Sequence, residues 1–244
     1  SGVNSINWAR IIAQSVYYFY SYLSVEDVSE PTNFSVPTGN FGDVYAGYLA
    51  KKMGLPIDKL IVATNQNDIL HRAISKGSYE AEKVSETISP SMDIQIASNF
   101  ERLIFDLNNG DDQQTSLDMK NIKEKGQYLI NDYKLNKISE NFLSARMSED
   151  ETLEVIKNVH EKFAVVLDPH TAIGYGAFDK HNLKGNNIVL ATAHPCKFPG
   201  AIQSAINVKA ELPNELTFVL DQKENYDIVE NDIEKVKQHI KDRT

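Results

Sequence analysis

The sequence predicts an α/β fold, with an open, mostly parallel twisted sheet, helices on both faces and a helical insertion. Short runs rich in β-branched residues alternate with helical patterns along the chain. These runs lack strict apolar/polar alternation, which is typical of parallel strands covered on both faces. The 244 residues, 41% of them hydrophobic, are enough for one substantial core. We therefore expect residues 1–244 to form a single α/β domain, with residues 108–146 as an insertion within it.

The first predicted element is a helix over Ile6–Leu23. Its apolar residues recur at steps of three and four, and others fall elsewhere around the helix, so we expect burial on most of its surface. Asn4 and Ser5 stand where its N-terminal cap is expected. Because a guanidinium and two amides lie inside the segment, it is not predicted to span a membrane.

The remaining elements follow in order along the chain. Strands are expected at residues 34–38, 59–64, 163–168, 187–192 and 216–221, and helices at residues 42–53, 67–76, 98–107, 149–162 and 200–207 and around Ile233–Ile240. A capping box of Ser148 and Glu151 marks the start of the helix at residues 149–162. Residues 108–120 are polar and acidic, which predicts a solvated surface loop, and residues 121–146 have a helical pattern.

Charge and cysteine content argue against several classes of function. The formal net charge is -9, and Lys and Arg form no cluster of five or more, so neither nucleic acid nor a membrane is an expected partner. The single cysteine, Cys196, cannot form an internal disulfide or by itself a thiolate metal site. We therefore predict a cytoplasmic protein without a metal centre.

The loop PTGNFGD, after the first predicted strand, is the first candidate binding site, because ligands of such folds lie outside the carboxyl ends of the strands. Gly39 and Gly42 permit backbone angles that a side chain would forbid. The N–H groups of Gly39, Asn40, Phe41 and Gly42, with the Thr38 hydroxyl, are expected to converge on one anion at the start of a helix. The loop is neither a Walker loop nor a dinucleotide fingerprint. A tight turn without a ligand is the alternative.

Two further strand ends carry reactive side chains. Asp168 and His170 flank a proline, where an acid–base pair and ordinary turn chemistry both fit the sequence. The segment TAHPCKFPG brings together a hydroxyl, an imidazole, a thiol and an amine. A nucleophile pair of His194 and Cys196 requires converging side chains, which Pro195 between them makes hard to assume.

Six strings of residues, taken in order, resemble the threonine synthase family: NSINWARIIAQ, PTGNFGDVYAGYLAKKMGLPI, ATNQNDIL, SPSMDIQIASNFERL, DPHTAIGY and LATAHPCKFP. The likeness runs from about Asn4 to Phe198. It implies the large domain of a pyridoxal-phosphate enzyme of fold type II, in the group of the tryptophan synthase β chain. The implied reaction converts O-phospho-L-homoserine and water to L-threonine and phosphate, the last step of threonine biosynthesis. This is the work of a carbon–oxygen lyase acting on phosphates.

The resemblance also implies roles for particular residues. The cofactor's 5′-phosphate would be held by the first loop, and its pyridine nitrogen would meet a hydroxyl, which gives as cofactor-binding residues Thr38, Gly39, Asn40, Phe41, Gly42 and Thr192. A neutral hydroxyl does not favour a protonated ring as a carboxylate does. The candidates for holding the substrate phosphate are Ser5, Asn7, Arg10 and Lys197. A capping role for Ser5 and an ion pair between Arg10 and an acid are the alternatives.

One expected feature of the family is missing from this sequence. Its members hold the cofactor as a Schiff base on a lysine in a motif like F-K-D, which lies before NSINWAR, and no such motif occurs here. Lys197 does not stand at that position of the family. The resemblance therefore implies the carboxy-terminal half of a threonine synthase, with no catalytic residue of its own and inactive alone. Its partners would be O-phospho-L-homoserine and the missing N-terminal part. A non-catalytic α/β module that binds a phosphate ligand or a protein is the alternative.

Overall fold

The computed structural model describes residues 4–243, and the chain divides into two compact units, Ser1–Ala210 and Glu211–Thr244. The smaller unit contains a 3-10 helix, η3 (Asn214–Asp221), and a helix, α10 (Ile233–Lys241). The strand expected at residues 216–221 is therefore wrong. Leu216 and Phe218 are exposed there, and a β-rich composition forms a strand only where a partner strand is available.

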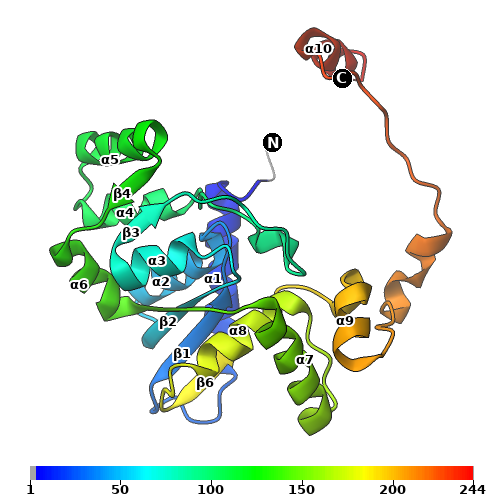
Figure 1. The fold of residues 1–244 in the computed structure, drawn as a ribbon, viewed down its shortest axis with the longest axis horizontal. Helices are drawn as coiled ribbons and strands as arrows, with labels where there is room; N and C mark the ends of the chain where they lie inside the picture. Colours follow the sequence, from blue (N-terminus) through cyan, green and yellow to red (C-terminus); the bar gives the residue numbers. More distant parts are fainter. Residues whose placement is uncertain (1–3, 244) are drawn as a thin grey trace. The chain divides into compact units, whose positions relative to one another are not determined.

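A four-stranded parallel sheet forms the centre of the larger unit (Figure 1). Its strands, in the spatial order β5-β2-β1-β6, are β1 (Thr32–Pro37), β2 (Ile57–Thr64), β5 (Phe142–Arg146) and β6 (Asn186–Val189). Val36 pairs with Val62 between β1 and β2, and Ala63 pairs with Ala145 between β2 and β5. Because every pairing in this sheet is parallel, the four carboxyl ends lie at one edge.

Both faces of this sheet are buried under helices. Phe34 and Leu60 pack in a core cluster with residues of α1 (Trp8–Leu23), α2 (Gly42–Lys52), α3 (Ile69–Lys76) and α4 (Phe100–Leu107). Ile61 and Ala63 point to the other side and pack with residues of α8 (Pro169–Asp179). Outside α8 lie α7 (Glu149–Phe163) and α9 (Pro199–Ile206). The predicted fold class is confirmed, and double burial explains why the strands do not alternate in polarity.

Helix α1 is less buried than its sequence predicts. It buries Ile11, Ser15 and Tyr18, whereas Val16 and Tyr20 are more than half exposed. Because apolar residues surround the whole helix, the three- and four-residue spacing does not identify the face that packs on the sheet. The helix is capped by the Asn7 carboxamide, which accepts a hydrogen bond from the Ala9 N–H group at 3.0 Å, and not by Asn4 and Ser5.

The segment predicted as a surface loop contains a helix instead. Asp111 caps α5 (Asp112–Lys125), and Asn108 donates to Thr115 and Asp118 at 3.0 Å each inside a buried polar cluster. These polar side chains bond one another, while most other residues of the segment are exposed, so the segment is solvated as expected but helical and not a loop. Residues 121–146 are also not all helical, since β4 (Gln127–Leu129) and β5 flank α6 (Asp132–Asn141).

Residues 163–168, expected to form a strand, instead contain the end of α7 and the turn that leads to α8. Helix α7 begins with the predicted Ser148–Glu151 capping box and continues to Phe163, and Ala164 then turns the chain with a φ of 55°. Asp168 caps α8, in which small residues allow close packing on the sheet. Three short elements complete the larger unit: β3 (Ser78–Glu80), which pairs with β4, and the 3-10 helices η1 (Pro90–Met92) and η2 (Pro195–Lys197).

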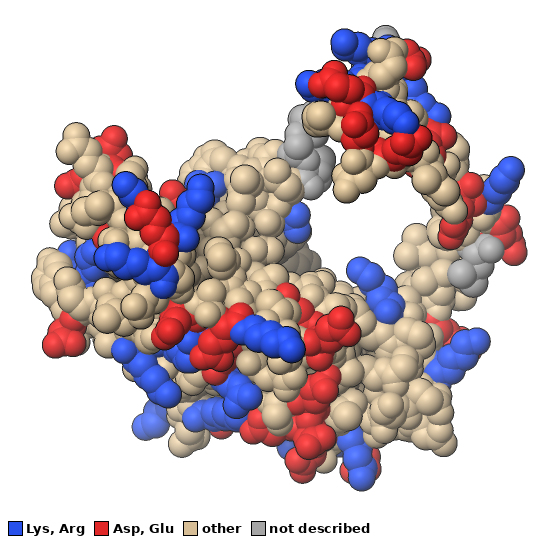
Figure 2. Space-filling model, turned by 45° about the horizontal axis from the view of Figure 1, so that its top comes forward, with Lys and Arg blue, Asp and Glu red and all other residues tan. Residues whose placement is uncertain are grey.

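Charged side chains of both signs are interspersed over the face shown in Figure 2. This distribution agrees with the lack of any long Lys/Arg run in the sequence. Within residues 4–243, no helix combines the length and the apolar character that crossing a bilayer requires.

Candidate functional site

A cavity of about 850 Å³ opens at the carboxyl ends of β1 and β6. Its walls come from α1, the loop between β1 and α2, η1, α8 and the segment after β6. Nine of the ten predicted site residues line it: Ser5, Arg10, Thr38, Gly39, Asn40, Phe41, Gly42, Thr192 and Lys197. The tenth, Asn7, caps α1. The cavity thus lies at the carboxyl edge of the parallel sheet, where ligands of such folds bind.

The loop between β1 and α2 leaves several backbone amides without partners. Within residues 4–243, no hydrogen bond uses the N–H group of Gly39, Asn40 or Phe41 as donor. These groups stand at the N-terminus of α2, where the helix dipole also favours negative charge. The Thr38 hydroxyl is already engaged, because it donates to the Val36 carbonyl oxygen at 2.6 Å. The loop therefore offers backbone donors to an anion, and Thr38 shapes the turn.

The two glycines of the loop serve close packing, which corrects the expectation that they supply unusual backbone angles. Neither has a positive φ; the left-handed residue is Phe41, with a φ of 66°. A Cβ atom on Gly39 would lie 2.7 Å from the Ser91 carbonyl oxygen. The ring of Phe41 is buried and contacts Phe100 at a centroid distance of 5.2 Å, which holds the strained backbone in place.

Asn99 at the start of α4 holds the loop, and the sequence analysis missed its role. Its side-chain amide donates to the carbonyl oxygens of Ser5 at 2.8 Å and Asn40 at 3.1 Å. Arg102 in turn donates to the Asn99 side-chain oxygen at 3.1 Å and to the Ile6 carbonyl oxygen at 2.9 Å. These bonds fix the start of α1 against the loop. The motif SNFER, which carries both residues, was the available signal.

Asp43 adds an ionisable group to the same cavity. Burial raises its pKa to about 6, although hydrogen bonding from Tyr18 and the charge of Arg10 act in the opposite direction. The Tyr18 hydroxyl lies 3.3 Å from Asp43 Oδ1 and 2.8 Å from the Asp43 carbonyl oxygen. The charge of Arg10 thus acts on Asp43, but within residues 4–243 no ion pair joins Arg10 to an acid, and its side chain lies on the cavity wall.

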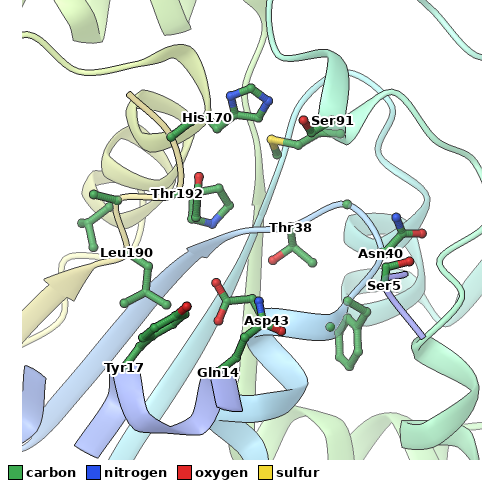
Figure 3. A pocket seen from close by; sticks show the side chains of 18 of the residues that line it. Ser5, Gln14, Tyr17, Thr38, Asn40, Asp43, Ser91, His170, Leu190 and Thr192 are labelled. Atoms are coloured by element: carbon green, nitrogen blue, oxygen red, sulfur yellow. The ribbon is translucent and has the colours of Figure 1, made fainter. Parts of the chain in front are cut away.

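A buried network fixes the opposite wall. His170 Nδ1 lies 2.9 Å from Asp168 Oδ1, and the Thr171 hydroxyl donates to Asp168 Oδ2. Burial raises the pKa of Asp168, but the hydrogen bonds from His170 and Thr171 outweigh it and keep the pKa below the usual range. Thr171 also accepts from the Thr192 N–H group at 3.3 Å. The acid–histidine contact and the capping role of Asp168 coexist, and together they position Thr192 on the cavity wall (Figure 3).

The reactive side chains after β6 do not form a nucleophile pair. His194 Nδ1 accepts a hydrogen bond from the Cys196 backbone N–H group at 3.2 Å, so the imidazole caps η2. Within residues 4–243, no group of three or more His, Cys, Asp and Glu side chains is arranged to hold a metal ion. Lys197 is exposed and lies on the cavity wall, where it offers a positive charge.

Known proteins match this chain over nearly its whole length. A family model described as the C-terminal part of threonine synthase matches residues 171–240. Threonine synthase from Pseudomonas aeruginosa is 42% identical over 241 residues, which cover 98% of this chain and 51% of that protein. The threonine synthase of Saccharomyces cerevisiae is 43% identical over 269 residues, covering 98% and 52%. A crystal structure of PLP-bound threonine synthase from Brucella melitensis has a TM-score of 0.95 and 45% identity, covering 99% and 52%. The chain thus spans about half the length of these relatives.

Proposed function

The chain belongs to the threonine synthase family, and we propose that its cavity binds pyridoxal 5′-phosphate for the conversion of O-phospho-L-homoserine and water to L-threonine and phosphate. The relative from Brucella melitensis is described as bound to this cofactor. When bound, the cofactor supplies an electron sink for carbanion chemistry. Because the chain spans about half of its relatives, the complete reaction is proposed for the full-length protein.

The observation that carries this proposal is the set of free amides on Gly39, Asn40 and Phe41. They lie at the N-terminus of α2 and at the carboxyl edge of the sheet, which is a favourable place for a phosphate group. The residues fit the cofactor, because the absence of a side chain on Gly39 leaves the loop packed closely on η1 with its donors open. Thr192, across the cavity, offers a neutral hydroxyl for the pyridine nitrogen.

Ser5, Arg10 and Lys197 are proposed to hold the phosphate of the substrate. All three line the cavity, and two of them bring positive charge to its rim. Arg and Lys form charge-assisted hydrogen bonds with phosphate oxygens. Asn7 is a weaker candidate, because its carboxamide oxygen accepts the Ala9 N–H group as the cap of α1.

We further propose that the lysine bonded to the cofactor belongs to the other half of the full-length protein. The sequence lacks the F-K-D motif in which the family carries it. The isolated chain should then bind the cofactor without forming that bond and should be inactive alone. The cytoplasmic location and the treatment of residues 1–244 as one domain with an insertion stay predictions.

The test is a titration of the chain with pyridoxal 5′-phosphate and, in parallel, with pyridoxal. Trp8 is the only tryptophan, so its fluorescence reports quenching by the bound cofactor. We expect saturable quenching with the phosphorylated form and much weaker binding of pyridoxal, since the amides of the loop recognise the phosphate. Equal affinity for both compounds would contradict the assignment. Binding of phosphate esters in general, without preference for the pyridine ring, would favour the non-catalytic module.

A further inference from the structure

The side chain of Asp43 lies on the wall of the cavity and has no part in the function proposed above. Asp43 is the second residue of α2 and directly follows Gly42 of the phosphate-binding loop. Figure 3 shows its carboxylate beside Gln14 and Tyr17 of α1, below Thr38. An acid next to an anion-binding loop is unexpected, because like charges repel.

The groups around Asp43 stabilise its charge only in part. On α1, the Tyr18 hydroxyl lies 3.3 Å from Oδ1 but donates at shorter distance, 2.8 Å, to the Asp43 carbonyl oxygen. The positive charge of Arg10, also on α1, lowers the pKa of Asp43. From α2 itself, the helix N-terminus favours a negative side chain. The other titratable groups on the cavity wall are Tyr17, Tyr20, His170 and Lys197.

The net effect of these surroundings is that burial dominates and raises the pKa of Asp43 to about 6. At pH about 7.5 such a group is mostly ionised, and a second negative charge beside it favours the protonated form. A phosphate monoester is mainly a dianion at this pH, because its second pKa is about 6. Binding of phosphate at Gly39–Phe41 therefore favours proton uptake by the neighbouring acid.

We propose that Asp43 takes up one proton from solvent when a phosphate monoester binds to the loop, and that its O–H group then donates a hydrogen bond to a phosphate oxygen. The inference rests on the proposed function, because it requires the cofactor phosphate at the free amides. Protonation turns a repulsive neighbour into a donor and leaves the ligand as a dianion. The affinity for phosphate should therefore fall as the pH rises, because proton uptake by Asp43 becomes less favourable.

The test is calorimetric titration with pyridoxine 5′-phosphate, which has no aldehyde and forms no Schiff base with any lysine. Titrations in two buffers of different ionisation enthalpy give the number of protons taken up. At pH about 7.5 we expect between roughly half a proton and one proton per bound ligand, and close to none with Asp43→Asn. Between pH about 6.5 and 8.5 the wild-type Kd should rise by up to about tenfold per pH unit, and by much less in the variant.

Two further variants make the test specific. Asp58→Asn removes an exposed acid of β2 and should leave proton uptake unchanged. Tyr18→Phe removes a donor that lowers the Asp43 pKa, so the loss of affinity should begin at higher pH. Binding without proton uptake, or uptake that persists in Asp43→Asn, would overturn the inference alone. Failure of wild type to bind the ligand at any pH would overturn both the inference and the proposed function.

Discussion

Replacing Gly39 by alanine tests whether the loop is built by close packing. The added Cβ atom would lie 2.7 Å from the Ser91 carbonyl oxygen and 3.3 Å from Met92 Cα, and real Cβ contacts essentially never fall under 3.0 Å. The obstacle is backbone, and η1 cannot move freely, because Asn65 Nδ2 donates to Ser89 Oγ at 2.9 Å and the Met92 side chain is buried. The loop or η1 must therefore shift by several tenths of an ångström.

The expected loss of stability follows from two opposing effects. Overpacking of this kind costs about 1–3 kcal/mol. Replacing glycine in a permitted conformation returns about 0.4–1 kcal/mol through the unfolded chain. We therefore expect Gly39→Ala to lower the free energy of unfolding by about 1–2 kcal/mol in urea denaturation. The affinity for pyridoxine 5′-phosphate should fall by about 10- to 150-fold if one amide loses its place, since a hydrogen bond to a charged group contributes about 1.5–3 kcal/mol.

Two other glycines provide matched controls. A Cβ atom on Gly42 would lie 3.2 Å from a side-chain atom, Asn99 Nδ2, and not against backbone, so Gly42→Ala should cost less stability than Gly39→Ala. A Cβ atom on Gly200 in α9 would have no atom of another part of the described chain within 4 Å, so Gly200→Ala should raise the free energy of unfolding by about 0.5–1 kcal/mol. If Gly39→Ala unfolds at the same urea concentration as Gly200→Ala and binds the ligand normally, the packing argument is refuted.

Substitutions at three other residues of the site give further predictions. Asp43→Asn should raise the free energy of unfolding by about 1–3 kcal/mol at pH about 8 and by little at pH about 4. The reason is that the pKa of Asp43 is raised in the folded protein, so its charged form destabilises the fold at pH values above that pKa. Equal effects at both pH values would argue against a buried charge. Phe41→Ala should lower the free energy of unfolding by about 3–5 kcal/mol through loss of the buried ring. Phe41→Gly should lower it by no more, because glycine tolerates the left-handed φ. If urea denaturation shows the glycine variant to be much less stable than the alanine variant, this reasoning is contradicted. Asp168→Asn should lower the free energy of unfolding by about 2–3 kcal/mol at pH about 7, and by less as the pH falls through the pKa of Asp168 in the folded protein. The hydrogen bonds that lower this pKa stabilise the fold only while the group is ionised. Thermal melts in which wild type and variant differ equally at every pH would refute this.

The position of the site could be predicted because it depends on local patterns and one topological rule. The loop between Thr38 and Gly42 joins a recognisable strand to a recognisable helix, and parallel strands place such loops at one edge. Lys197 and Thr192 follow another strand of the same sheet, so they were expected on the same side. These patterns located Thr38–Gly42, Thr192 and Lys197 on the cavity wall without showing which strands are neighbours, whereas Ser5 and Arg10 were expected there only from the family resemblance.

The misses arise where tertiary contacts override local patterns. Residues 163–168 are rich in β-branched and apolar residues but extend α7 and connect to α8, while the less apolar β5 takes the edge of the sheet next to β2. Phe41 carries the left-handed backbone because Phe100 encloses its ring, a long-range contact that the glycine pattern conceals. Asn99 lies 59 positions from Asn40, so the motif SNFER marks the residue but does not show that its side chain contacts the loop.

The most direct test of the central claim is an NMR titration of the backbone amides with pyridoxine 5′-phosphate. The N–H signals of Gly39, Asn40 and Phe41 are expected to shift most on saturation, since within residues 4–243 these groups have no hydrogen-bond partner before the phosphate arrives. Pyridoxine without the phosphate should leave these three signals in place. Saturable binding that moves other amides and leaves these three unchanged would show that the phosphate lies elsewhere and would contradict the account.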